Sequence, residues 1–267
     1  MAYAIIDALI KVCSEGLFPH CACLCEFAQQ FHAVMKKLFI LLLPFLLNAA
    51  PKGVPEGYKL AYKQDFENAD SLKDFISTDS RVWKWGKDGD RGYIEHFGRS
   101  KYKYKVRSPY NIALVGGVEV KNFVLFVDLQ QTGKEYGHRD MCIFYNFQDR
   151  SHFYYTHIAS VTDNHAHNCF IVNNKPRTKI SHETTKGHKW SSKPWHNVKL
   201  VREQESGKID IYVNDMDKPI MRATDKTFGM GRIGFGSFDD TGRISKVRLY
   251  APESNKNPGD DPFTEGR

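Results

Sequence analysis

Histidines gather in one part of this chain. Nine histidines follow residue 50, and seven of them lie between His138 and His188. The same stretch holds tyrosine, asparagine and arginine side chains. Histidine changes charge near neutral pH, and arginine presents a planar fork of donors that matches a carboxylate. This stretch is therefore where we expect a catalytic or ligand-binding site.

Three kinds of site are open for this stretch. Aromatic and polar side chains can line a sugar groove, because rings cover the apolar faces of pyranoses while polar groups bind hydroxyls. A tyrosine or histidine can act as base and acid beside a cation that neutralises a carboxylate, as β-elimination from a uronic acid requires. His165 and His167, one residue apart, can hold a metal ion together with a nearby aspartate or histidine. A solvated sheet face without a ligand is the fourth reading.

The candidate residues follow from these readings. Acid–base chemistry is assigned to His138, Arg139, Tyr145, His157 and His167. Substrate binding is assigned to Tyr155, His165, Asn168, Lys175, Arg177 and Trp190, the last as the best exposed tryptophan.

Strand periodicity predicts how some of these side chains meet. If residues 141–147 and 152–159 pair as a hairpin across residues 148–151, Tyr145, Tyr155 and His157 can share a face. In residues 166–172 the two-residue period places His165 and His167 on the face of Cys169 and Ile171.

The elements that must position these residues are strands. From residue 58 onward, short runs rich in Val, Ile, Phe, Tyr and Thr alternate with Gly, Asn, Asp and Pro clusters, and only residues 71–75 suggest a helical turn. Thirteen candidate strands, among them residues 102–107 and 118–131, fit two packed antiparallel sheets of a jelly-roll sandwich. Residues 197–202 and 208–213 each alternate polar and apolar, which predicts a hairpin with one solvated face.

The closing strands carry a resemblance. They read Trp195-His-Asn-Val-Lys-Leu-Val-Arg, Gly207-Lys-Ile-Asp-Ile-Tyr-Val-Asn-Asp, Pro219-Ile, Gly231-Arg-Ile-Gly-Phe-Gly-Ser-Phe-Asp-Asp-Thr-Gly and Val247-Arg-Leu-Tyr. This ending resembles the concanavalin A-like lectin/glucanase superfamily, especially its laminin-G and 3-keto-disaccharide hydrolase branch. The resemblance implies a curved sandwich whose concave face handles glycans.

Two carboxylate patterns limit the chemistry. A retaining glycosidase needs two carboxyl groups about 5.5 Å apart, and no Glu-x-Asp-x-Glu pattern occurs in the chain, so ordinary endoglucanase activity is disfavoured. Asp239 and Asp240 predict a turn, although such a turn can also hold a structural Ca²⁺ ion. Nothing in the sequence matches a phosphate-binding glycine loop or a serine nucleophile motif.

An export signal is predicted inside the chain. Met35-Lys-Lys, the apolar residues 38–47 and Asn48-Ala-Ala have the order of a signal peptide over residues 35–50, and the apolar run is too short to span a bilayer. We therefore interpret residues 1–34 as an extension from a start codon assigned too early, residues 55–252 as the domain and residues 253–267 as a disordered tail. The product is expected to be secreted or periplasmic, without stable membrane insertion.

Charge and cysteines complete these expectations. Residues 1–50 hold three basic and three acidic residues, so the remainder keeps the whole formal charge of +7, which favours a polyanion such as acidic polysaccharide. Residues 99–107 alternate cations with other residues and can meet a polyanion or protect a sheet edge from pairing. Whether Cys142 and Cys169 form a disulfide stays open.

The sequence leaves three functions open. The first is an exported module that binds a polysaccharide, expected to be acidic, through the stretch from His138 to Arg177. The second is an enzyme acting on glycans by lyase or, as the resemblance implies, 3-keto-sugar chemistry. The third is a structural or adhesion domain. Nucleic acid is not an expected partner.

Overall fold

The structure is a computed structural model that describes residues 51–192, 194–257 and 259–267. The predicted signal peptide and residues 1–34 lie outside the described residues. The chain divides into the units Met1–Val54 and Pro55–Arg267, and the second unit contains all strands of the described residues. Within the described residues, no helix is long and apolar enough to cross a membrane.

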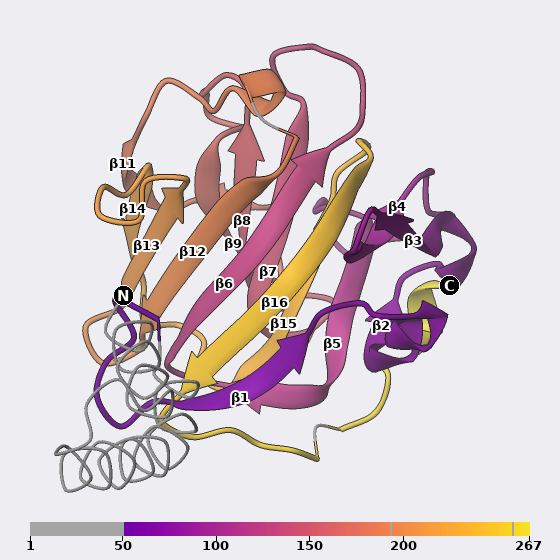
Figure 1. Cartoon of the computed structure of the whole chain (residues 1–267). Helices are drawn as coiled ribbons and strands as arrows, with labels where there is room; N and C mark the ends of the chain where they lie inside the picture. The colour runs from indigo at the N-terminus through magenta and orange to yellow at the C-terminus, as the bar shows by residue number, and fades with distance from the viewer. Residues whose placement is uncertain (1–50, 193, 258) are drawn as a thin grey trace, which may run out of the picture. The chain divides into compact units, whose positions relative to one another are not determined.

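Two antiparallel sheets make up the second unit (Figure 1). In spatial order, the larger sheet contains β11 (Ser181–Thr184), β14 (Met221–Thr224), β13 (Lys208–Val213), β12 (His196–Glu203), β6 (Phe123–Gln131), β16 (Gly242–Ala251), β4 (Arg91–His96) and β3 (Trp83–Asp88), and β1 (Lys59–Gln64) also pairs with β16. The seven-stranded sheet contains β10 (Thr178–Lys179), β9 (Asn168–Asn173), β8 (His152–Ala159), β7 (Asp140–Asp149), β15 (Gly231–Ser237), β5 (Asn111–Val120) and β2 (Phe75–Ser77). The predicted two-sheet sandwich is confirmed.

Short 3₁₀ helices join some of these strands. They are η1 (Ala69–Asp74), η2 (Ser80–Val82), η3 (Trp190–Ser192) and η4 (Thr264–Gly266). The first matches the predicted helical turn, and Asn68 caps it by accepting a hydrogen bond from the Asp70 amide at 2.9 Å.

Alternation along the strands builds two apolar layers. Side chains of one parity fill the space between the sheets, as Val198 and Leu200 do on β12. On the seven-stranded sheet the other parity is apolar too, so its outer face carries a second cluster that includes Phe144, Phe153 and Tyr155. This outer face is covered by other parts of the chain, because Tyr102, Tyr110 and Phe263 belong to the same cluster.

Two predicted strands differ from the structure. Residues 102–107 form no strand, although Tyr102 is buried as the alternation predicts. The single strand predicted over residues 118–131 is two strands, β5 and β6, which turn at Lys121 and Asn122. The turn is fixed by Asn146, whose side-chain amide donates to the carbonyls of Val120 and Lys121 at 3.2 Å.

The residues after 252 pack onto the domain rather than away from it. Asn255 exchanges backbone hydrogen bonds with Glu119, and the Phe263 ring is fully buried against Tyr102 and Phe147. This differs from the disordered tail that composition predicts, because one phenylalanine in an otherwise polar segment is enough to anchor it in an aromatic layer.

Candidate functional site

A buried carboxylate and a histidine meet on the outer face of the seven-stranded sheet. Asp140 opens β7, and His157 lies on β8 opposite Cys142. The His157 Nε2 atom is 3.1 Å from Asp140 Oδ2, and the Cys142 thiol donates to the same oxygen at 3.0 Å. Because Nε2 faces a carboxylate, it carries the proton and donates it, which leaves Nδ1 as the free nitrogen of the ring.

Hydrogen bonds stabilise the charge of Asp140 despite its burial. Burial alone opposes ionisation, but the positive charge that His157 carries when protonated and the donors around the carboxylate hold the pKa of Asp140 below its ordinary value. Ser237 Oγ donates to the other carboxylate oxygen at 2.9 Å. Burial, and then the negative charge of Asp140, raise the pKa of the Cys142 thiol, so Cys142 is a donor and not a nucleophile.

Polar atoms without partners surround this pair. His157 Nδ1, the Tyr155 hydroxyl and the Nε and Nη1 atoms of Arg177 are all buried without a hydrogen-bond partner. Buried polar atoms are normally hydrogen-bonded, because leaving one unpaired costs about 1–3 kcal/mol. Other buried side chains, among them His96 and Arg202, also have unpartnered atoms, but here several lie together on one face, and this grouping makes the face a candidate binding site.

Two phenylalanines join these polar groups into one cluster. The Phe170 ring stacks on Tyr155 with a centroid distance of 5.1 Å and meets His157 edge-on at 6.4 Å. The Phe238 ring centroid lies 6.2 Å from that of His157 and 4.3 Å from the Arg177 guanidinium carbon. We call this set the His157 cluster: Asp140, Tyr155, His157, Phe170, Arg177 and Phe238.

Arg177 is the accessible member of the His157 cluster. Its side chain is half-buried, while Tyr155 is fully buried and His157 is 4% exposed. Its Nη2 atom donates weakly to the His165 carbonyl at 3.4 Å, and within the described part of the chain it pairs with no carboxylate. A cation held against two aromatic rings without a counter-ion is suited to an anionic ligand.

Of the residues predicted for the site, the structure brings four together: Tyr155, His157, Asn168 and Arg177. Tyr145 is not among them, since it pairs with Tyr154 and points into the core between the sheets. The hairpin itself is confirmed, but the prediction that Tyr145 shares a face with Tyr155 is wrong. Tyr145 lies opposite Tyr154, so Tyr145 and Tyr155 point to opposite faces of the sheet. The left-handed Asn146 (φ 46°) follows Tyr145, and the register of the hairpin shifts between Tyr145 and the turn.

His167 has a structural position. It is fully buried, its Nε2 lies 2.9 Å from Thr185 Oγ1, and burial followed by the charge of His157 lowers its pKa to about 4. His165 is exposed, and His167 has φ 51°, which breaks the strand period that would align the two rings. The groups of metal-capable side chains among the described residues do not include either histidine.

Three of the remaining candidates lie apart from the His157 cluster. His138 is exposed and contacts Asp163 at 2.7 Å, Arg139 is buried against Gln131 and Glu135, and Lys175 is exposed in the turn after β9. These three have no role in the site as the structure shows it.

Asn168 borders the cluster. It is buried on β9 directly opposite His157, and its side-chain amide donates to backbone carbonyls. Its Oδ1 atom is buried without a hydrogen-bond partner, like His157 Nδ1.

Trp190 was predicted to be exposed, and this is wrong. Its ring is buried between His188 and His196 at centroid distances of 4.9 and 5.2 Å. The polar residues around it in sequence suggested exposure, but the ring packs against one of them, His188, against His196 on β12 and into the core between the sheets.

The predicted calcium ligands do not fit a calcium ion. Carboxylate oxygens of Asp140, Asp239 and Asp240 lie within 4.8 Å of one another. However, Asp240 Oδ2 accepts hydrogen bonds from the Tyr136 hydroxyl and the Asp140 amide at 2.7 and 2.9 Å, and both oxygens of Asp140 are engaged. Calcium needs six to eight free oxygen ligands.

Asp140, Phe170 and Phe238 are site residues that the sequence did not single out. Asp140 directly follows the candidates His138 and Arg139, and Phe238 precedes the pair Asp239 and Asp240. The position of Asp140 at a strand end and that of Phe238 beside a turn were signals in the sequence. Phe170 had no such signal, although successive strand residues point to opposite faces and so place Phe170 on the face opposite Cys169.

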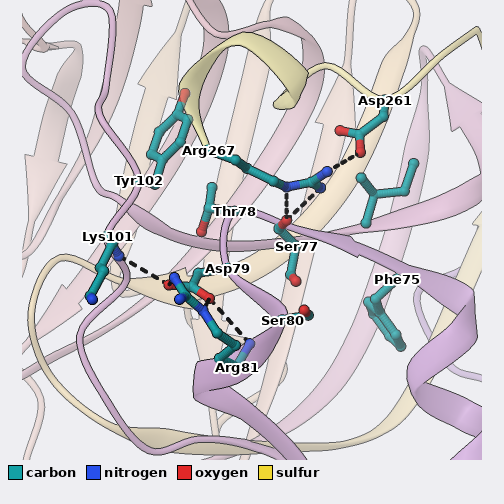
Figure 2. A pocket seen from close by; sticks show the side chains of 11 residues that line it. Phe75, Ser77, Thr78, Asp79, Ser80, Arg81, Lys101, Tyr102, Asp261 and Arg267 are labelled. Atoms are coloured by element: carbon teal, nitrogen blue, oxygen red, sulfur yellow. Dashed lines mark hydrogen bonds and ion pairs between the residues drawn. The ribbon is translucent and has the colours of Figure 1, made fainter.

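A separate pocket opens at the edge strand β2 (Figure 2). It has a volume of about 520 Å³ and an apolar wall of Phe75, Ile76 and Tyr102. Four of its charged side chains are mutually paired, and Lys101 is not: Arg81 Nε donates to Asp79 at 2.8 Å, and Arg267 pairs with Asp261 and donates to the Ser77 carbonyl. The pocket thus combines an apolar wall with charged side chains. None of the residues that line it has a buried polar atom without a hydrogen-bond partner, as the His157 cluster has.

Comparison with known proteins yields structures only. No family model matches the chain, and no curated protein matches its sequence. Similar solved structures include the carbohydrate-binding module CBM66 from Bacillus subtilis, with 16% identity and a TM-score of 0.48 over 67% of this chain and 96% of that chain. They also include a protein of unknown function with a galectin-like fold from Bacillus subtilis, with 12% identity and a TM-score of 0.46 over 72% and 97% of the two chains. The metal-free lectin I-B4 of Griffonia simplicifolia has 11% identity and a TM-score of 0.45 over 73% and 100%. The fold assignment rests on the strand pairing of the chain itself.

Proposed function

We propose that this protein is an exported carbohydrate-binding β-sandwich that recognises an acidic sugar through the His157 cluster. The observation that carries the proposal is Arg177, a half-buried cation with two buried, unpartnered nitrogens and no carboxylate partner within the described part of the chain. A uronate carboxylate would supply the missing acceptors and counter-charge.

The other members of the His157 cluster suit a sugar ring. Phe238 and Phe170 offer apolar surface next to Arg177, while Tyr155 and His157 hold an unused hydroxyl and an unused ring nitrogen. Sugars combine apolar ring faces with hydroxyls, so rings beside a few convergent polar groups form a suitable site. The net charge of +7 favours the approach of an anionic chain.

Isothermal titration calorimetry with polygalacturonate and with a neutral glucan tests this proposal. The wild type should bind polygalacturonate and not the glucan. Arg177→Gln should weaken binding by about 30-fold or more, since losing one side of a buried charge pair costs at least about 2 kcal/mol. Arg222→Gln is the matched control, because Arg222 is exposed on the larger sheet. Equal affinity of wild type and Arg177→Gln would refute the proposal.

Proton transfer is a second candidate function, favoured by the contact between Asp140 and His157. With Nε2 held by Asp140, His157 Nδ1 is free to accept the proton α to a uronate carboxylate that Arg177 neutralises. As the double bond of the uronate forms, the proton that His157 Nδ1 has accepted can pass to the leaving oxygen. Burial raises the pKa of Tyr155, so its hydroxyl stays protonated and can donate a hydrogen bond to the substrate. Absorbance of the unsaturated uronate, present with wild type and absent with His157→Gln, would establish this activity; its absence with wild type would leave binding alone.

A further inference from the structure

The segment between β4 and β5 is strongly basic and irregular. Residues 99–107 contain five cations, at positions 99, 101, 103, 105 and 107, and no acidic residue. The segment forms no strand, so its lysines do not protect a sheet edge from pairing, which would be the usual structural explanation of such a pattern. Another reason for the concentration of charge is needed.

The backbone of this segment is held in place without regular structure. Tyr102 is buried, and half-buried Val106 packs on the outer apolar cluster. The Lys101 amide donates to Asp79 at 3.1 Å, the Lys103 amide to the Gly266 carbonyl at 2.9 Å, and Arg150 Nη2 to the Lys103 carbonyl at 3.0 Å. The side chains of Tyr102 and Val106 and these hydrogen bonds hold the backbone, and this fixes the directions in which the residues between them point.

The cations of the segment face solvent and are not neutralised. Lys101, Lys103, Lys105 and Arg107 are exposed, and none forms an ion pair with a carboxylate of residues 51–192, 194–257 or 259–267. Tyr104 lies among them and is 42% exposed. Exposed cations interleaved with an aromatic ring can bind the charge and the ring face of an anionic sugar chain.

The segment leads from the His157 cluster to two pockets. At one end, the Arg177 amide donates to the Arg107 carbonyl at 3.2 Å, so the segment ends beside the cluster. Toward the other end, Lys101 lines the pocket at β2, where Arg81 and Arg267 are paired with Asp79 and Asp261 (Figure 2). A second pocket of about 530 Å³ includes Lys105 together with Arg150 and three carboxylates. The unpaired positive charge beyond the cluster therefore comes from the lysines of the segment itself.

We infer that residues 99–107 form an extended binding surface for a polyanionic polysaccharide, which continues from the sugar held at Arg177. The inference rests on the proposed function and adds to it that the ligand is a polymer bound over several acidic units. Each cation then releases counter-ions when the chain binds, which makes the affinity depend on salt.

The test compares polygalacturonate with trigalacturonate, using a triple variant in which Lys101, Lys103 and Lys105 become Gln. The triple variant should bind the polymer at least about ten-fold more weakly, with a log–log salt slope shallower by about 1–2. Its affinity for trigalacturonate, held at Arg177, should be unchanged. A triple variant with Lys59, Lys87 and Lys218 changed to Gln is the matched control, since these lysines are exposed on the larger sheet or its connections.

The outcomes separate this inference from the proposed function. If the triple variant binds the polymer like wild type while Arg177→Gln loses trigalacturonate, the surface is refuted and the proposed function stands. If the control triple weakens polymer binding as much as the test triple, net charge is the cause and the surface is refuted. Equal affinity of wild type for DNA of the same charge would also refute a polysaccharide surface. Circular dichroism spectra and unfolding midpoints matching wild type verify that both variants fold.

Discussion

At the scale of single residues, hydrogen-bond partners distinguish Asp140 from the polar residues around it. Asp140 has donors for both of its oxygens, whereas Arg177, Tyr155 and His157 each keep at least one unused atom. Other buried side chains, such as His96 and Arg202, also keep unused atoms, so the site is marked by the grouping of such atoms beside the unpaired cation Arg177. We therefore regard Asp140 as a residue that positions His157, and Arg177 as the residue that would meet the ligand.

Asp240 gives the site a pH dependence that can be measured. Burial and then the charge of Asp140 raise its pKa from 3.8 to about 7. The folded state thus binds a proton that the unfolded state has released, so this contribution to stability is present at low pH and is lost as the pH rises through about 7. Asp240→Asn keeps an acceptor for Tyr136 but cannot ionise.

We expect wild type to lose stability relative to Asp240→Asn between pH 5 and pH 8, by about 1 kcal/mol or more. Urea unfolding of both proteins at several pH values measures this difference. Parallel stability curves over that range would show that Asp240 ionises normally.

At the scale of elements, the strands were largely predictable and their irregularities were not. The alternation in residues 197–202 and 208–213 predicted the β12–β13 hairpin. Its outer face is less solvated than predicted, because Lys199 and Asp210 are buried. The left-handed residue His167 breaks the strand period without a signal in the sequence pattern, which is why the sequence aligned it with His165. Tyr145 was misplaced for another reason: antiparallel pairing sets it opposite Tyr154, and so on the other face from Tyr155.

The C-terminal segment is an element that composition concealed. Residues 253–267 are polar except for the two prolines and Phe263, yet Phe263 is fully buried between Tyr102 and Phe147. Its ring links this segment to the basic one, so its removal should loosen the cover of the outer face.

We expect Phe263→Ala to lower the free energy of unfolding by about 3 kcal/mol, as for other buried phenylalanines. Phe97→Ala is the matched control, since Phe97 is 45% exposed, and it should change stability by less than about 0.5 kcal/mol. Equal effects of the two substitutions in urea unfolding would contradict the packing of this segment.

At the scale of the whole molecule, the two faces of the seven-stranded sheet separate groups that look alike in sequence. Cys142 belongs to the outer apolar cluster and Cys169 to the core between the sheets, and both are free thiols. They also lie on β7 and β9, which β8 separates. Sequence alone left their pairing open, because it did not show which face of the sheet each cysteine occupies.

We expect no disulfide in the folded protein after purification in air. Alkylation with iodoacetamide in denaturant, without reductant, should label both Cys142 and Cys169 by mass spectrometry. A protein lacking both labels, with a mass two units below that of the dithiol, would mean that the strands differ from this structure.

The central claim is that Arg177 holds the acidic group of a sugar, and nuclear magnetic resonance can observe its side chain directly. The Nε–H signal of Arg177 is identified as the one that is missing in Arg177→Gln. On titration with trigalacturonate we predict that this signal shifts in a saturable manner while the Arg222 signal stays in place. Backbone amide shifts that saturate elsewhere while the Arg177 signal does not move, or no response at all, would contradict the account.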